Sequence, residues 1–397
     1  MKHYIEIENV GPIKKAKIDL SKYVVLIGPQ GSGKSIIAKL IAIFQNDLNP
    51  GKIFDSFDSL IIKFGLNSFF TVESKIFFST PFFLTIFQQN ELSIEIQKDI
   101  YEKYFNETDV KKETKKKKLK GSKNFPISKI ANNIIDKKND VELSKFINVL
   151  PLFQKPSIYI PAERIIISLL SQSIYSLIKN KINLPELLLD FAANYELARN
   201  EIKEYNIKFL KANYSYKNGK EILEINKQET PIAEAASGFQ TLIPLLLVCE
   251  YFLKDKLSQT YIIEEPELNL YPTAQKDLIY HLINIVNNSY NKELYTSHDL
   301  VITTHSPYIL ASLNNLLLAG KIKEEQAIKF AKAKKIVKGD FYISKNDLNV
   351  YALKNGKAKS IISKETGLIA ENELDHVSEE INYEFNALKN LYFESAN

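Results

Sequence analysis

The chain has 397 residues, a length that suits one large domain or two ordinary ones. Its composition, 45% hydrophobic and 25% charged with a formal net charge of +5, is that of a globular protein. No run reaches the roughly 18 apolar residues of a membrane helix, and the single cysteine, Cys249, excludes an internal disulfide or a multi-cysteine zinc site. The N-terminus alternates like a strand instead of resembling a secretory signal, so we expect a cytoplasmic protein without a membrane partner.

The first elements are short strands followed by a glycine-rich loop. Residues 4–10 and 16–20 alternate apolar and polar side chains around Gly11-Pro12, which predicts a hairpin. Residues 23–27 form a continuous apolar run, as expected of a strand buried on both faces of a sheet. Residues 36–44, after the glycine-rich loop, have the apolar spacing of a helix.

The middle of the chain gives weaker signals. Residues 111–140 are rich in lysine and asparagine and predict a loop or a helical insertion. Residues 165–212 show helical spacing that is broken near Pro185, which predicts an arm of two helices. Residues 212–225 predict a hairpin around Asn218-Gly219.

The C-terminal part alternates buried strands and helices. We expect buried strands at residues 157–161, 260–263 and 300–304, helices at 238–253 and 273–286, further strands at 341–343 and 350–353, and a last helix at 374–391. Cys249 falls in an apolar helix and is expected to be buried packing. Buried strands alternating with helices predict an α/β protein with a parallel or mixed sheet.

These elements divide the chain into five expected segments. They are an N-terminal lobe with the glycine-rich loop (1–110), a lysine-rich insertion (111–140), a helical arm with a hairpin (141–230), a C-terminal lobe (231–320) and a C-terminal β and helix extension (321–397).

A phosphate-binding loop is the most specific motif. Its sequence is Gly28-Pro29-Gln30-Gly31-Ser32-Gly33-Lys34-Ser35, which fits G-x-x-x-x-G-K-[ST] between a strand and a helix. Glycines let backbone N–H groups converge on phosphate oxygens, and the helix N-terminus favours the same anion. We therefore predict ATP binding, with Lys34 on the β- and γ-phosphates and Ser35 on Mg²⁺; the alternative is a chance match.

Acidic residues follow the apolar strand at 260–263. In this arrangement one acid holds the Mg²⁺ shell and the next orients the attacking water. Glu264 is our metal candidate, through a water because of its extra methylene, and Glu265 is the candidate general base. The alternative is two surface acids at a strand end.

Two further candidate motifs are a histidine after a strand and the start of a helix. His305 follows the strand at 300–304, where it could contact the γ-phosphate or the attacking water; the alternative is an ordinary loop histidine. Ser237 and Gly238 precede a helix, and Ser237 is placed to cap it. In a head-to-tail dimer, the same helix end could face the γ-phosphate held by the other subunit.

These four motifs resemble those of the ABC-type ATPases of the RecF, SMC and OLD group. Residues 7–13 and the phosphate loop look like the start of those ATPase heads, and Ser237-Gly238 matches the core of their signature motif, although Phe239 replaces a second glycine. Residues 264–272 resemble the E-E-P-E-x-H-L-x-P form of OLD-like ATPases, with Asn269 in the histidine position. His305-Ser306-Pro307 matches their switch histidine, and the similarity covers roughly residues 1–45 and 230–315.

The stretch Pro161-Ala162-Glu163-Arg164 resembles one found in OLD-like ATPases of bacterial phage-defence systems. Arg164 could lie near the nucleotide or the dimer interface, or form a plain salt bridge. The resemblance implies an ABC-ATPase head with a mixed central sheet, an N-terminal antiparallel β layer and an inserted helical arm. It also implies a homo-oligomer in which two heads enclose two ATP molecules, each site completed by the partner's Ser237-Gly238.

The chain departs from several relatives of this group. It is too short between its two nucleotide motifs for the long SMC coiled coil, and it has no D-x-D pair after His305 such as the Toprim nuclease of OLD proteins carries. We therefore expect it to control a separate effector protein encoded nearby, such as a nuclease, as the ATPases of the PARIS and Septu defence systems do.

Other functions remain open. The lysine-rich run is either a solvated insertion or an arm that contacts the phosphates of DNA or RNA. It consists of Lys111, Lys112, Lys115, Lys116, Lys117, Lys118, Lys120 and Lys123. No aromatic residues interleave these lysines to stack on bases, which favours the solvated insertion. A RecF-like DNA-repair ATPase is the main alternative function, followed by a self-contained nuclease and a transporter ATPase.

Overall fold

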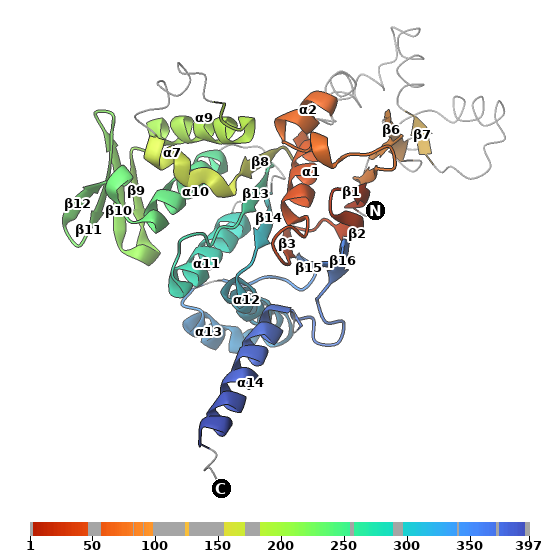
Figure 1. Cartoon of the computed structure of the whole chain (residues 1–397). Helices are drawn as coiled ribbons and strands as arrows, with labels where there is room; N and C mark the ends of the chain where they lie inside the picture. The colour runs from red at the N-terminus through yellow and green to blue at the C-terminus, as the bar shows by residue number, and fades with distance from the viewer. Residues whose placement is uncertain are drawn as a thin grey trace, which may run out of the picture.

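The computed structural model describes residues 3–46, 57–81, 83–89, 91–97, 124–126, 155–170, 183–254, 258–288, 297–339, 341–370 and 373–393. The lysine-rich run at 111–123 lies outside these ranges. The described residues form a twelve-stranded mixed sheet and a separate four-stranded sheet, with helices packed around them (Figure 1). In these ranges, every helix is too short or too polar to span a lipid bilayer.

Five parallel strands form one half of the large sheet. Their order is β8 (Ser157–Ile160), β13 (Thr260–Glu264), β14 (Asp299–Thr304), β3 (Tyr23–Ile27) and β15 (Leu348–Lys354). Every residue of β3, β8 and β13 is buried, which explains their continuous apolar sequences. The expected α/β class and the buried strands at 23–27, 260–263 and 300–304 are confirmed.

The other half of the sheet is mainly antiparallel. It continues with β16 (Lys357–Ser360), β2 (Ile13–Asp19), β1 (Tyr4–Val10), β4 (Lys75–Ser79), β5 (Phe83–Gln88), β6 (Glu91–Gln97) and β7 (Asn124–Pro126). Val10 pairs with Ile13 across Gly11-Pro12, so the expected N-terminal hairpin is confirmed. These strands extend the same sheet that contains β3, and β16 links the two halves.

Helices cover both faces of the parallel half. Alternate residues of β3 belong to different core clusters: Val24 and Leu26 pack with α1 (Lys34–Asn46) and α2 (Phe57–Lys63) on one face. Tyr23, Val25 and Ile27 pack with helices of the other face. Those helices are α9 (Glu186–Glu201), α10 (Ser237–Leu253), α11 (Pro272–Asn288) and α12 (Pro307–Glu325).

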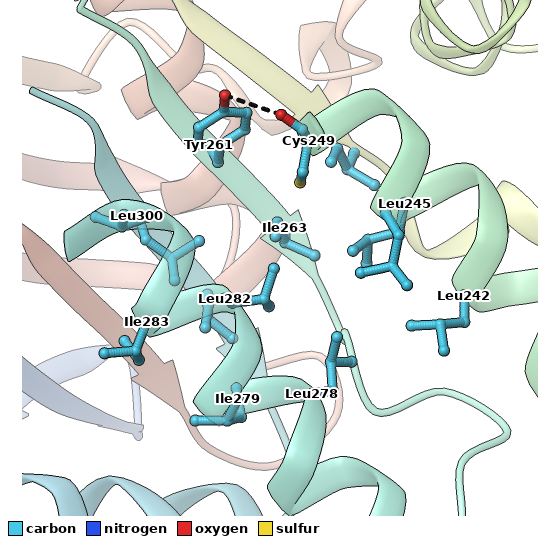
Figure 2. Packing of buried hydrophobic residues seen from close by; sticks show 14 of the residues in the cluster. Leu242, Leu245, Cys249, Tyr261, Ile263, Leu278, Ile279, Leu282, Ile283 and Leu300 are labelled. Atoms are coloured by element: carbon cyan, nitrogen blue, oxygen red, sulfur yellow. Dashed lines mark hydrogen bonds between the residues drawn. The ribbon is translucent and has the colours of Figure 1, made fainter. Parts of the chain in front are cut away.

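Figure 2 shows this second core from close by. Leu242 and Leu245 of α10 face Ile263 of β13 and Leu278 of α11. Cys249 lies in the same layer with 1% of its surface exposed, which confirms its expected role in packing.

The segment after β8 combines helices with the small sheet. It contains α7 (Ile165–Leu170), α9, and the antiparallel strands β9 (Glu204–Ile207), β10 (Ala212–Lys217), β11 (Lys220–Ile225) and β12 (Gln228–Pro231). Asn218 and Gly219 form the turn between β10 and β11 with φ angles of 52° and 75°, so this hairpin is confirmed. The remaining elements are α13 (Ala327–Ile336), α14 (Glu373–Phe393) and the 3₁₀ turns η1 (Asn67–Phe69), η3 (Ala162–Arg164), η4 (Lys208–Leu210) and η5 (Ile232–Glu234).

Two local expectations were wrong. The helical spacing suggested helix up to residue 212, but α9 ends at Glu201, because Ile207 pairs with Ala212 and is buried by the small sheet. Residues 341–343 are not a strand, since the N–H of Ile343 donates to Leu316 O of α12. In both segments, backbone hydrogen bonds to residues outside the segment determined the secondary structure.

Candidate functional site

The loop after β3, the acids after β13 and His305 after β14 lie at one edge of the sheet. β14 runs parallel between the other two strands and pairs Thr303 with Glu264 and Thr304 with Ile27. Carboxyl ends of parallel strands lie at the same edge, where α/β proteins bind ligands. The structure therefore brings together segments that are far apart in the sequence.

Glycines allow the loop between β3 and α1 to pass close to its neighbours. Gly28 has a φ of 149°, and an added Cβ would lie 2.5 Å from Leu353 O of β15. Gly33 has a φ of 99°, and a Cβ there would lie 2.7 Å from Ile13 Cγ1 of β2. The loop conformation thus depends on glycine at both positions, and it leads directly into the N-terminus of α1.

Lys34 is held inside this loop. Its Nζ donates to Gly28 O at 2.8 Å and to Pro29 O at 3.0 Å, and only 5% of the residue is exposed. Burial lowers the pKa of Lys34, and the carboxylates of Glu265, then Glu267 and Glu264, act in the opposite direction. The lysine and the acids therefore share one electrostatic environment.

The remaining loop positions differ in exposure. Pro29, Gln30, Gly31 and Ser35 are exposed, whereas Ser32 is half-buried. The hydroxyl oxygen of Ser32 is inaccessible and has no hydrogen-bond partner in the described part of the chain. Because buried polar atoms are normally satisfied, this hydroxyl marks a place where a polar ligand fits.

Glu264 is the last residue of β13 and is 5% exposed. Its Oε1 is buried without a hydrogen-bond partner among the described residues. The carboxylate raises the pKa of the Tyr159 hydroxyl, whose shift is caused first by burial. A buried carboxylate oxygen without a partner is costly, and a bound cation or its water shell would remove that cost.

Glu265 adopts an uncommon backbone conformation at the end of the strand. Its φ is 41°, and its N–H donates to Thr303 O at 3.0 Å. Its Oε1 lies 3.3 Å from Nε2 of His305, and both side chains are about one-third exposed (31% and 35%). Strained non-glycine residues gather at functional sites, and this one carries an accessible carboxylate.

Burial, followed by the charge of Lys34, lowers the pKa of His305, while Glu265 acts in the opposite direction. The pKa of this imidazole therefore lies below the ordinary histidine value of 6.5, which favours the neutral form at pH 7. A neutral imidazole beside a carboxylate can donate one hydrogen bond and accept another.

Glu267 is a further residue of the candidate site, to which the sequence analysis assigned no role. Its Oε1 accepts hydrogen bonds from Thr304 Oγ1 at 2.6 Å and from the His305 N–H at 2.9 Å. Its Oε2 is buried without a described partner, and burial raises the pKa of the carboxyl group. In the sequence, Glu267 could have been noticed as the third acid of E-E-P-E. In the fold, its carboxylate fixes the backbone of His305.

Arg164 ties this edge of the sheet to α10. The side chain has no exposed surface, and its guanidinium donates to four backbone carbonyls: Thr241 O (3.2 Å), Pro161 O (3.0 Å), Glu264 O (2.7 Å) and Glu265 O (2.8 Å). Burial lowers its pKa to about 10, so it stays charged at neutral pH. Among the described residues Arg164 forms no plain salt bridge; it lies beside the candidate nucleotide site and holds the backbone of both candidate acids.

Ser237 and Gly238 begin α10, and one expectation about them was wrong. The N-cap residue is Ala236, and the cap has no side-chain hydrogen bond, so Ser237 does not cap the helix. Ser237 is instead exposed in the first turn. Gly238 packs against the loop after β13, where an added Cβ would lie 2.8 Å from Asn269 O.

Comparison with known proteins identifies a family for the chain. A family model described as "AAA ATPase domain" matches residues 1–310. Among solved structures, the chain is similar to an SMC head domain from Thermotoga maritima, with 11% identity, 91% of this chain and 98% of that chain covered, and a TM-score of 0.38. It is also similar to an SMC head bound to the C-terminal winged-helix domain of ScpA, with 13% identity, 91% and 96% coverage, and a TM-score of 0.37. No curated protein matches the chain.

Proposed function

The chain belongs to the AAA ATPase domain family, and on this basis we propose that residues 28–35, Glu264, Glu265 and His305 form one ATP-hydrolysing site that works in pairs. Membership of the family makes the chain an ATP-binding ATPase. The observation that carries the site assignment is the register of β14, which lies parallel between β3 and β13. This register supports a single triphosphate held by the loop and reached by the acids.

Mg²⁺ fits the residues at this edge. The orphaned Oε1 of Glu264 is a hard oxygen ligand at a buried strand end, and the hydroxyl of Ser35 is exposed at the start of α1. When bound, Mg²⁺ would neutralise charge on the phosphate oxygens. Glu264 and Ser35 would hold it, and Lys34 would contribute its own positive charge to the same phosphates.

Glu265 and His305 are the groups that act on the attacking water. Glu265 Oε1 accepts the proton of that water as general base, and His305 Nε2 orients the water or contacts the γ-phosphate. Glu267 and Arg164 touch no reacting atom. Arg164 donates to the backbone carbonyl of Glu265, and Glu267 accepts from the backbone N–H of His305.

Two chains complete each other's sites in this proposal. The exposed hydroxyl of Ser237 and the N-terminus of α10 offer donors to a γ-phosphate held by a second copy. ATP then joins the two copies, and hydrolysis releases them. The site is therefore a switch whose output is the association state.

The output partner is a separate effector protein in bacterial phage defence. Support comes from the resemblance of the E-E-P-E stretch at Glu264 and the P-A-E-R stretch at Pro161 to OLD-like ATPases of such systems. An effector encoded nearby, such as a nuclease, would be held inactive or released by the association state of the ATPase.

The test is a mass measurement of the full chain with and without ATP and Mg²⁺. Glu265→Gln should bind ATP, hydrolyse it slowly and accumulate an ATP-dependent paired species. Adding Ser237→Arg to this variant should abolish the ATP-dependent gain in mass. Ala193→Arg, which places the same charge at an exposed position of α9, should not. A Glu265→Gln chain whose mass does not respond to ATP would refute the paired site.

The effector is tested by co-expression with the products of neighbouring genes. A nuclease that is toxic only when the ATPase is absent, or only when it cannot hydrolyse ATP, supports the proposal. DNA binding by the ATPase alone, with steep salt dependence that disappears when Lys111–Lys123 are replaced by neutral residues, would favour the RecF-like alternative.

A further inference from the structure

A groove lies away from the candidate ATP site, between η4, α11, α12 and α13. Its volume is about 880 Å³. Leu318, Ile322, Ile336 and Val337 line it from α12 and from α13 with its C-cap. Leu318 is 48% exposed and Ile336 is 80% exposed, so apolar side chains border the groove without being covered. An apolar groove of this size is typical of a binding surface.

The groove has a polar floor and a basic wall. At the floor, the Tyr205 hydroxyl donates to Glu250 Oε1 at 2.9 Å and lies 3.1 Å from His281 Nε2. The wall carries three lysines, Lys208, Lys276 and Lys338, against two acids, Glu250 and Asp277. Exposed Lys329, Lys332 and Lys335 lie on α13 beside this lining without belonging to it. Positive charge therefore prevails at the groove and favours an acidic partner.

α14 is an amphipathic helix that no other described element covers from residue 380 onwards. Figure 1 shows it extending away from both sheets beyond α12 and α13. All of residues 380–392 are exposed. Ile381, Phe385 and Leu388 lie four and three residues apart, which places them on one face of the helix, and they are 60%, 64% and 66% exposed.

The charge of α14 is opposite to that of the groove wall. Glu380 and Glu384 are exposed beside the apolar face, and Lys389 is the only lysine or arginine in the helix. Two α14 helices placed side by side would bring like charges together. An acidic helix with an apolar stripe therefore fits the basic groove better than it fits itself.

We propose that α14 of one copy of this chain docks in the α12–α13 groove of a second copy. Ile381, Phe385 and Leu388 enter the groove against Leu318 and Ile336. The acids of α14 face the lysines that line the groove. This contact uses no residue of the nucleotide site, so it holds two chains together without ATP and keeps a second pair of faces free for ATP-dependent pairing.

Sedimentation equilibrium of the full chain in nucleotide-free buffer tests the contact. The wild type should associate from 45.5 kDa towards twice that mass as its concentration rises. Phe385→Asp with Leu388→Asp, and separately Leu318→Asp with Ile336→Asp, should each raise the dissociation constant roughly 30-fold or more, as for buried hot-spot side chains. Ile62→Asp, an exposed position of similar accessibility (63%) on α2, should change nothing.

Mixing the two defective variants tests whether α14 of one copy binds the groove of another. One variant retains an intact groove and the other an intact α14, so an equimolar mixture should regain a paired species through one contact. Circular dichroism and ATP turnover like those of the wild type would show that each variant is folded. A wild type that stays at 45.5 kDa, or a groove variant that associates like the wild type, would overturn the proposal. ATP-dependent pairing is measured separately, so either proposal can fail alone.

Discussion

Two clusters built around buried glutamates, one glutamate in the small sheet and two at the edge of the large sheet, differ in how the carboxylate oxygens are satisfied. Glu221, in the small sheet, has a side chain only 7% exposed and both oxygens occupied. Oε1 accepts from the hydroxyls of Tyr195 and Tyr214, and Oε2 from Arg199 Nη1 at 3.2 Å. Glu264 and Glu267, at the edge of the large sheet, each keep one buried oxygen without a described partner.

The difference separates a structural network from a binding site. Around Glu221 both carboxylate oxygens are paired, although Nε of Arg199 is buried without a described partner. Paired oxygens stabilise the fold, and removal of the carboxylate leaves its donors unsatisfied. An open network costs free energy until a ligand completes it. The two clusters should therefore respond in opposite ways to mutation, and the following experiments measure that contrast.

Lys34→Ala should have the largest effect on the open cluster. It removes the buried ammonium that bonds the loop carbonyls and feels the charge of the glutamates. Nucleotide affinity should fall at least roughly 100-fold, to below detection by calorimetry. Lys39→Ala, in the same helix, should bind ATP normally. Unchanged affinity in Lys34→Ala would show that the loop does not hold the triphosphate.

Glu265→Gln should preserve ATP binding and slow turnover by about 10²- to 10⁴-fold, because the amide cannot accept the proton of the attacking water. Phosphate release under single-turnover conditions measures this step. Glu234→Gln, at an exposed position, is the matched control. Normal turnover in Glu265→Gln would remove Glu265 from the role of general base.

His305→Gln should lower turnover by about 10²-fold, the effect expected for losing one hydrogen-bonding group at the reacting phosphate. The pKa of His305 is lowered below 6.5, so its neutral form persists to more acidic pH than that of an ordinary histidine. In the wild type, the loss of turnover due to its protonation should occur below pH 6.5 as the pH falls. A variant with an unchanged pH–rate profile would contradict this assignment.

Arg164→Lys should reduce turnover roughly tenfold while leaving ATP affinity nearly unchanged, because a single ammonium cannot reach four carbonyls and the acids shift slightly. Comparison of kcat with the dissociation constant of ATP separates this positioning role from a general loss of folding. Equal losses in both quantities would assign Arg164 to stability alone.

Glu221→Gln should affect turnover least and stability most clearly. The amide leaves part of the tyrosine and arginine network unsatisfied, so the free energy of unfolding should fall by about 1–3 kcal/mol. Glu264→Gln is its counterpart, with lower turnover but little loss of stability. Chemical denaturation and ATPase assays on both variants would show whether the two clusters differ as described.

Much of the candidate site could be predicted from sequence because each motif lies within a few consecutive residues. The phosphate loop requires glycine at positions such as Gly28 and Gly33, and both glycines are visible in one short segment of sequence. The hairpin at Asn218-Gly219 depends on two adjacent positive φ angles. The apolar runs of β3 and β13 likewise reflect burial of consecutive residues.

The rest depended on partners that are distant in the sequence. Ile207 became part of a strand because Ala212 pairs with it, and residues 341–343 followed α12 instead of a neighbouring strand. Arg164 acquired its role only when Thr241 and the end of β13 came within reach of one guanidinium. Glu267 likewise became significant because Thr304 and His305 lie beside it.

The sequence by itself determined the chemistry of each segment, because backbone freedom, apolar periodicity and charge are properties of neighbouring residues. Tertiary structure alone decided which segments meet. Only because β14 lies between β3 and β13 do Lys34 and the acids at the end of β13 interact electrostatically. It also decided which buried oxygens remain without partners. Hydrogen-bond satisfaction is a property of the packed chain, and local sequence does not encode it.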